Sequence, residues 1–386
     1  MGSGVILNSN TGVHGLQLNT GSQNALTDPS PSINNVSISE VSISTTTASA
    51  VVLSNLSGAL SFTRVSANGA ATGISLTNTA GSFSVTGDAS ADNNSSGGTI
   101  QNTTSHGILL SNAENIALDQ MNIQNTGGSG INGTQTANFA FTNGTINASG
   151  NAFGETNIAF NGAGSGQGNN ISGTFSVTGS TLTNAYFGGI DLENDAGTIS
   201  HLTIQNNTIR SSTSALASKG SGIKLIGSGN TSTVANLSAA SIADNTIQYF
   251  PSEAGIQVSY GNSSNGPGGT ANSITINNNT ISGQSAASGL GTHGISFALN
   301  GGNIANRSTG SVVISNNHIT NTTGHSLVIG NNGNATLTAS VINNIIIANN
   351  SSASNGISGG NGVVNNSSDI PNLTLTVTDN QISQTD

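Results

Sequence analysis

The sequence predicts an all-β fold, a parallel β-helix, in which short strands stack on their counterparts one repeat further along the chain. Two observations carry this prediction. First, apolar and polar residues alternate strictly in short segments such as 202–204 (LTI) and 274–276 (ITI), and this period of two is that of a strand with one buried face. Second, a motif with this alternation recurs along the chain without a helical segment between its copies.

The first repeated motif places two apolar residues around one polar residue, follows them with a polar turn and closes on another apolar residue. Its clearest copies are LTIQNNTI (202–209), ITINNNTI (274–281), VVISNNHI (312–319) and LTVTDNQI (375–382), and a looser copy is IIIANNSS (345–352). Successive copies are separated by 23 residues (Phe62 to Val85) to 38 residues (Ile204 to Ile242). A strand that returns at this spacing with no crossover helix cannot form a βαβ unit, so we expect a coil.

A second motif, Gly-Ile-x-apolar, precedes many copies of the first. Its copies are GISL (73–76), GILL (107–110), GIDL (189–192), GIKL (222–225), GIQV (255–258) and GISF (294–297). Each coil therefore contributes at least two strands, and the inward residues should form buried aliphatic columns, for example Ile190, Ile223, Ile256 and Ile295. We predict about 12 coils. Residues 5–386 are expected to be a single β-helix domain, a segment of a longer protein, with residues 1–4 as an expression leader.

The paired GIxL and IxIxNNxI motifs resemble the repeats of right-handed parallel β-helix proteins of the pectin-lyase-like superfamily, over about residues 5–386. The resemblance implies a right-handed solenoid. It is specific for the fold and much less so for function, because the superfamily includes polysaccharide lyases, glycoside hydrolases, phage tailspikes and the passenger domains of bacterial autotransporters.

Asparagine occupies one position of the first motif repeatedly in the C-terminal half of the chain. The members of this predicted ladder are Asn207, Asn245, Asn279, Asn317, Asn350 and Asn380. Asparagine tolerates a left-handed backbone at a bend between strands, and stacked amides can bond to each other along the axis. We therefore predict a structural ladder at this position, confined to the C-terminal half because earlier copies carry other residues there.

The strongest candidate for chemistry is the acidic run at 188–197 (GGIDLENDAG). Because alternate residues of a strand face the same way, Asp191 and Glu193 should both point outward, and Asp195 should lie in the following turn. Lys224 should stack on Asp191 one coil later, about 4.8 Å away. Two interpretations follow: a site, as a catalytic carboxylate pair with Lys224 or a Ca²⁺ site including Asp195, and a cross-strand ion pair, which we expect.

A histidine pair is the second candidate. His325 should stack on His293, because Leu327 aligns with Ile295, and such a pair could bind a metal or transfer protons, or be a feature of the turn. The His-Gly dipeptide is similar to one catalytic motif of the polygalacturonase relatives. The accompanying Asp motifs and the Arg-x-Lys motif are missing, so this resemblance does not imply their activity. Apart from a Ca²⁺ ion, we expect no cofactor.

Composition excludes several classes of function. Lys and Arg number 5 against 15 Asp and Glu, so the net charge is −10 and no basic surface for nucleic acid can form. Cysteine is absent, which excludes disulfides and cysteine-based metal sites. No apolar run is long enough to insert this segment into a membrane.

Three functions remain open for a solenoid of this composition. The first is a structural and adhesive module of a bacterial surface or secreted protein, whose partner is a host surface, a glycan or another copy of itself. The second is a polysaccharide-degrading enzyme, a lyase or glycoside hydrolase, acting on an outward strand face. The third is an ice-binding solenoid, although its outward threonines, such as Thr374 and Thr376, do not continue as a regular column. The scarcity of ionisable residues favours the first.

Overall fold

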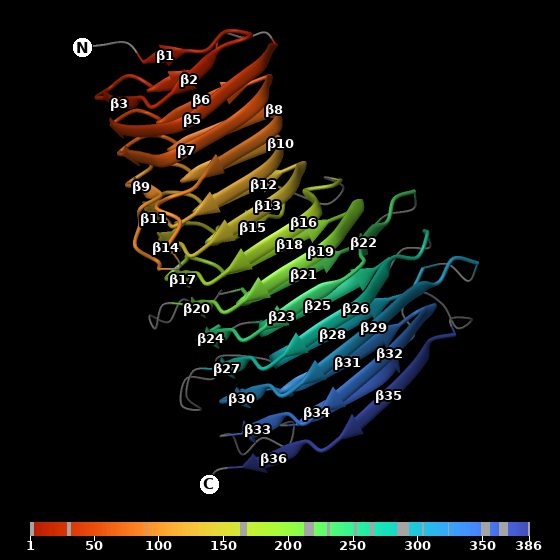
Figure 1. Cartoon of the computed structure of the whole chain (residues 1–386). Helices are drawn as coiled ribbons and strands as arrows, with labels where there is room; N and C mark the ends of the chain where they lie inside the picture. Colours follow the sequence, from red (N-terminus) through yellow and green to blue (C-terminus); the bar gives the residue numbers. More distant parts are fainter. Residues whose placement is uncertain are drawn as a thin grey trace. The chain divides into compact units, whose positions relative to one another are not determined.

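In the computed structural model, the protein consists of β-strands, and no helix occurs among the residues that the structure describes. These are residues 4–28, 32–90, 92–162, 168–211, 220–229, 232–250, 253–262, 266–283, 293–302, 305–322, 324–348, 356–362 and 370–384. The chain divides into two compact units: unit 1 is Met1–Phe160 with Thr174–Tyr186, and unit 2 is Asn161–Gly173 with Phe187–Asp386. Within each unit, strands pair in parallel with the strands one coil further on, which confirms the predicted parallel β-helix (Figure 1).

Each coil of unit 1 contributes to three columns of stacked strands, where at least two were predicted. The first column contains β1 (Val5–Ile6), β4 (Leu26–Thr27), β6 (Val51–Ser54), β8 (Ile74–Val85), β10 (Ile108–Asp119), β12 (Ile131–Thr134) and β15 (Ile158–Phe160). The second contains β2 (Gly12–His14), β5 (Ile33–Thr46), β7 (Leu56–Asn68), the later parts of β8 and β10, and β13 (Thr136–Thr142). The third contains β3 (Gln17–Thr20), the later parts of β5 and β7, β9 (Gly98–Gln101), β11 (Met121–Thr126), β14 (Thr145–Ser149) and β17 (Thr181–Thr183). Strand β16 (Ile171–Thr178) contains the boundary between the two units.

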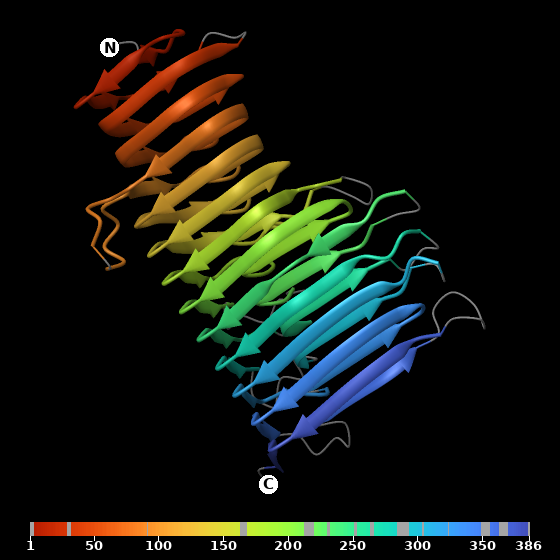
Figure 2. The same ribbon diagram turned by 45° about the vertical axis from the view of Figure 1, so that its right-hand side comes forward.

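Unit 2 repeats this arrangement. Its first column contains β18 (Ile190–Asn194), β21 (Ile223–Gly227), β25 (Ala254–Gly261), β28 (His293–Asn300), β31 (Leu327–Asn332) and β34 (Ile357–Gly362). The second contains β19 (Gly197–Gln205), β22 (Ala235–Leu237), β23 (Ala240–Ala243), β26 (Thr270–Asn277), β29 (Ser308–Ser315), β32 (Ala335–Ile342) and β35 (Asn372–Thr378). The third contains β20 (Thr208–Arg210), β24 (Thr246–Gln248), β27 (Thr280–Ser282), β30 (His318–Thr320), β33 (Ile345–Ala348) and β36 (Gln381–Gln384). The strands of one column lie side by side from coil to coil (Figure 2).

Aliphatic columns fill the interior, as the alternation predicts. The predicted column is formed by Ile190, Ile223, Ile256 and Ile295, which pair in register and are fully buried. Burying such a side chain stabilises the fold by roughly 1.5–3 kcal/mol. Unit 1 adds aromatic packing: Phe139 stacks on Phe175 with ring centroids 5.5 Å apart, and Phe160 meets both rings edge-on.

The glycine of the Gly-Ile-x-apolar motif has a steric cause. A Cβ atom on Gly222 would lie 2.5 Å from Cγ2 of Ile247 and 2.7 Å from the carbonyl oxygen of Gly255, the equivalent glycine one coil later. Real Cβ atoms do not approach other atoms this closely, so the backbone at Gly222 can lie against Ile247 and Gly255 only because it carries no side chain. The repeated glycine therefore marks the point where the end of one coil packs under the start of its first-column strand.

A buried asparagine ladder runs through unit 2. The amide Nδ2 of Asn207 donates to Oδ1 of Asn245 (3.0 Å), and Asn245 donates in the same way to Asn279 (2.9 Å). Each Oδ1 also accepts the backbone N–H of the preceding member, as Asn279 does from Asn245 (3.1 Å). The chain of amides continues through Asn317, Asn344 and Asn380. The ladder thus satisfies backbone donors that the bend between the second and third columns withdraws from strand pairing.

Two details of the predicted ladder differ in the structure. Asn350 lies outside the described residues, and Asn344 is the member between Asn317 and Asn380. The left-handed backbone lies one residue before the ladder, not at it. The residues with positive φ there are Asn206, Asp244, Asn278, Asn316, Asn343 and Asp379. The bend therefore uses two adjacent positions, an exposed one that turns the backbone and a buried one that bonds it.

Unit 1 contains exposed amide ladders that the sequence did not reveal. Nδ2 of Asn78 donates to Oδ1 of Asn55, and Nδ2 of Asn112 donates to Oδ1 of Asn78, both at 3.0 Å. All three residues have positive φ, from 49° to 57°, so the same residue type turns the backbone and bonds to its copy one coil away. Ladders consequently occur in both halves of the chain, and only the buried position is confined to unit 2.

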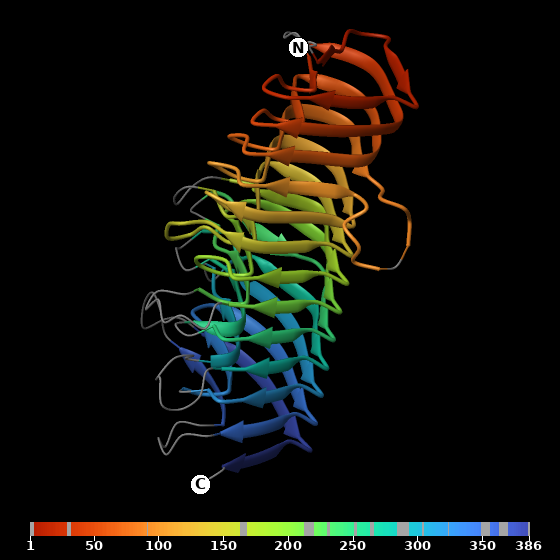
Figure 3. The same cartoon turned by 90° about the vertical axis from the view of Figure 1, so that its left-hand side faces the viewer.

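A long loop between β8 and β9 projects from unit 1 and is coloured orange in Figures 2 and 3. The fully buried Gln120 fixes it. Its Oε1 accepts from the Ser96 hydroxyl (2.7 Å) and from the backbone N–H of Asp88 (3.1 Å). Its Nε2 donates to the carbonyl oxygens of Ser90 (2.8 Å) and Asp92 (3.0 Å). One side chain of the body therefore holds both ends of the loop.

Candidate functional site

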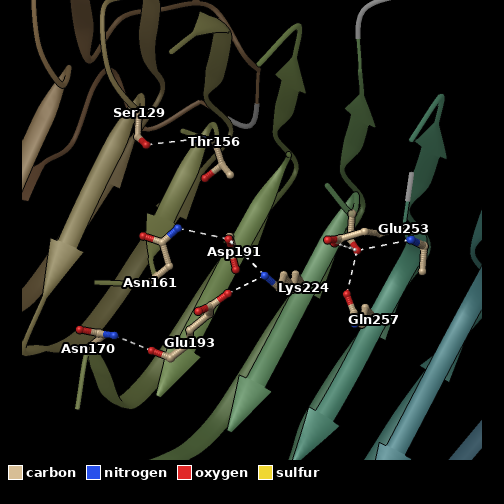
Figure 4. A network of polar contacts seen from close by, with 11 residues as sticks. Ser129, Thr156, Asn161, Asn170, Asp191, Glu193, Lys224, Glu253 and Gln257 are labelled. Carbon is tan, nitrogen blue, oxygen red and sulfur yellow. Dashed lines mark hydrogen bonds and ion pairs between the residues drawn. The ribbon is translucent and has the colours of Figure 1, made fainter. Parts of the chain in front are cut away.

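The acidic run lies on the first column of unit 2, where β18 and β21 are neighbours. Asp191 pairs in register with Lys224, and Glu193 pairs with Ile226. Both carboxylates project from the outward side of β18, as the alternation predicts, and Asp195 follows the strand. Lys224 reaches across to both acids, so the structure brings the three predicted residues together (Figure 4). We refer to Asp191, Glu193 and Lys224 as the charge cluster.

The ion pair within the charge cluster is uneven. Nζ of Lys224 lies 2.5 Å from Oε1 of Glu193 but 3.9 Å from Oδ2 of Asp191. The sequence paired Lys224 with Asp191 by register, whereas the flexible lysine side chain bonds the carboxylate two residues further along β18. The ammonium group of Lys224 therefore interacts more strongly with the carboxylate of Glu193 than with that of Asp191.

Asp191 is outward on its strand and is nevertheless buried, with only 3% of its surface exposed. Oδ2 accepts a hydrogen bond from Nδ2 of Asn161 (3.2 Å), whereas the buried Oδ1 has no partner among the described residues. Burial raises the pKa of Asp191 to about 7, although the charge of Lys224 opposes the rise. Burial alone would lower the pKa of Lys224, but the carboxylates of Asp191 and Glu193 outweigh it and raise that pKa. The carboxyl group of Asp191 can therefore hold a proton near neutral pH.

Further polar residues extend this face, and sequence reasoning missed them. Asn161 and Asn170 both precede β18, and Nδ2 of Asn170 donates to the carbonyl oxygen of Glu193 (2.5 Å). On the following coils, the Ser221 hydroxyl bonds Oε2 of Glu253 (3.0 Å) and Oε1 of Gln257 (3.1 Å). Gln257 is the exception among them, because it occupies the same position of GIQV (255–258) as Lys224 does in GIKL and pairs with Lys224 in register. The others lie outside the repeated motifs, so no periodic signal places them on this face (Figure 4).

The remaining candidates lie apart from the charge cluster in their contacts. Asp195 occupies the turn between β18 and β19, where its backbone N–H donates to the carbonyl of Gly168 (2.9 Å). The rings of His293 and His325 stack, with centroids 6.5 Å apart and an interplanar angle of 9°. Nδ1 of His293 donates to the carbonyl oxygen of His325 (3.0 Å).

Metal binding by these residues stays a prediction. Within the part of the chain that the structure describes, no three His, Asp or Glu side chains converge as a metal site would require. Among the described residues, no helix is long and apolar enough to span a bilayer. The chain matches no protein-family model and no curated protein sequence.

Proposed function

We propose that this protein is a structural and adhesive β-helix module of a bacterial surface or secreted protein, binding a host surface or glycan, or a second copy of itself, through its polar faces. The observation that carries the proposal is the exposed amide ladders, represented by Asn55, Asn78 and Asn112. They present donors and acceptors at the spacing of one coil with almost no charge. A regular neutral polar surface suits many weak contacts, whose combined affinity comes from multivalency.

The resemblance of the repeats to the right-handed pectin-lyase-like superfamily supports the same proposal, because autotransporter passengers are among its members. A chain without cysteine and with 5 cations among 386 residues is compatible with export from the cell. The proposal therefore includes a secreted or bacterial cell-surface location.

A polysaccharide-degrading enzyme is the second candidate, and one observation favours it. A buried carboxyl group that holds a proton near neutral pH is what a general acid requires, and Asp191 has this property. Lys224 and Glu193 would then position or polarise the substrate beside it.

One experiment separates the two candidates. The labelled protein is incubated with acidic and neutral glycans and with host cells, and the same mixtures are assayed for new reducing ends and unsaturated products. Retention without products is the expected result, and sedimentation velocity of the free protein measures self-association. Product formation that Asp191→Ala abolishes would overturn the adhesive proposal in favour of the enzyme.

A further inference from the structure

A groove of about 670 Å³ lies on the outward side of the third column of unit 1. It follows five successive coils, over β3, the later parts of β5 and β7, β9 and β11, and is therefore elongated along the coil axis. Its volume is within the range of ligand pockets, about 300–1,000 Å³. None of the residues that line it belongs to the charge cluster, which lies in unit 2.

The strand register builds most of the groove from two parallel rows of polar side chains, beside a shorter third row of Gln17, Ser42 and Arg64. One row is formed by Asn19, Ser44, Ser66, Thr99 and Asn122, and the other by Thr46, Asn68, Gln101 and Gln124. Within each row, residues on neighbouring strands lie about 4.8 Å apart along the axis. The two rows are about 7 Å apart, because they use alternate residues of each strand. The floor is a lattice of amides and hydroxyls.

These groups define the chemistry of a ligand. Amide and hydroxyl side chains each supply both donors and acceptors, so they match a ligand whose own groups do both, as the hydroxyls of a sugar do. Some of the lattice is already bonded, since Nε2 of Gln124 donates to Oε1 of Gln101 (2.7 Å). Such bonds fix the side chains before a ligand arrives and reduce the entropy lost on binding.

Arg64 supplies the one charge among the described residues that line the groove. Its Nε donates a long hydrogen bond to the Ser66 hydroxyl (3.4 Å), and it has no ion pair with any described residue. An exposed guanidinium with free N–H groups matches a carboxylate in a two-pronged geometry. Because the chain carries a net charge of −10, a densely charged polyanion would be repelled, whereas a glycan with an isolated carboxylate would not.

We propose that this groove binds an acidic oligosaccharide, with the sugar hydroxyls on the amide lattice and a carboxylate on Arg64. The proposal rests on the adhesive function above and gives it a site and a ligand class. The described residues that line the groove include no Asp, Glu, His or Lys that could form an acid–base pair, so we propose a binding site and not a catalytic one.

Paired probes test the groove. Affinities of the full chain are measured by calorimetry for 3′-sialyllactose against lactose, and for a hyaluronan tetrasaccharide against its carboxyl-reduced form. The wild-type protein should prefer the acidic member of at least one pair by about 10-fold, because a charge-assisted hydrogen bond is lost with the neutral one. Arg64→Gln should remove that preference and leave the affinity for the neutral member within about twofold.

Arg210→Gln is the matched control, because it makes the same change of net charge in unit 2, where Arg210 packs over Tyr249. It should leave the preference unchanged, and circular dichroism should show both variants folded. If Arg64→Gln still prefers the acidic oligosaccharides, or if the wild-type protein shows no preference in either pair, the proposed binding site in the groove is refuted. Adhesion through other faces would remain open. A chain that binds no glycan, no cell surface and no second copy would refute the adhesive function itself.

Discussion

Replacing Asn279 with alanine measures what the buried ladder contributes to stability. Asn279 is 1% exposed, its Nδ2 donates to the carbonyl of Ile242 and to Asn317, and its Oδ1 accepts from the N–H and Nδ2 of Asn245. Alanine removes all four bonds. The N–H of Asn245 loses its acceptor, while Nδ2 of Asn245 keeps its bond to a carbonyl of β19.

The magnitude follows from these losses. An orphaned buried donor costs about 1–3 kcal/mol, and each of the three other lost bonds about 1 kcal/mol, so the free energy of unfolding should fall by roughly 4–6 kcal/mol. Because a solenoid need not unfold in one step, the assay is native-state hydrogen exchange of the amides around Asn245, accompanied by thermal denaturation. Their exchange should accelerate by at least a hundredfold.

Asn277→Ala is the matched control, two residues away on β26. Its half-buried Oδ1 accepts from the hydroxyl of Ser315 and Nδ2 of Asn316, which both have access to water. It should cost less than about 1 kcal/mol. Equal effects of the two substitutions would refute the reasoning, because burial of the amide would then not matter.

Three further predictions follow from features of the two units. Gly222→Ala should lower the melting temperature far more than Gly360→Ala, where a Cβ meets no atom within 4 Å, and similar melting curves would contradict the steric account of the motif. Since the pKa of Asp191 rises from 3.8 to about 7 on folding, the native state holds the proton more tightly, and stability should fall as pH rises from about 4 to 7, by at most about 1.4 kcal/mol per unit. Asp191→Asn should flatten that slope in denaturation curves recorded at several pH values, and an unchanged slope would assign it to other groups. Gln120→Ala should expose the loop between β8 and β9 to limited proteolysis without unfolding unit 1, and a loop that stays resistant would show that its other contacts suffice.

The sequence predicts those features that the period of two determines. Register follows from alternation, because a slip by one residue would turn every apolar side chain outward, and Asp191 consequently pairs with Lys224 as predicted. Where two registers fit equally well, the sequence cannot choose between them. The segments around Asn344 and Asn350 both follow isoleucines or valines, and only stacking on Asn317 selects Asn344. Burial of Asp191 was also unpredictable, because Asn161, which bonds it, is 30 residues away and outside any repeat.

The amide-to-amide hydrogen bonds of the ladders have a direction, and two rows of amides in unit 2 run in opposite senses. In the buried ladder the bonds between amides all run toward the C-terminus, from Asn207 to Asn245 and onward. The second hydrogen of such an amide donates to a carbonyl one coil back, as from Asn279 to Ile242. In the exposed row beside it donation runs the other way, from Asn316 to Asn277 and from Asn343 to Asn316. Bonds aligned in one chain polarise and strengthen one another, and the amide dipoles of two chains of opposite sense oppose each other. Each ladder can thus become stronger as coils are added, while the dipoles of its amide-to-amide bonds are partly offset by those of the neighbouring row.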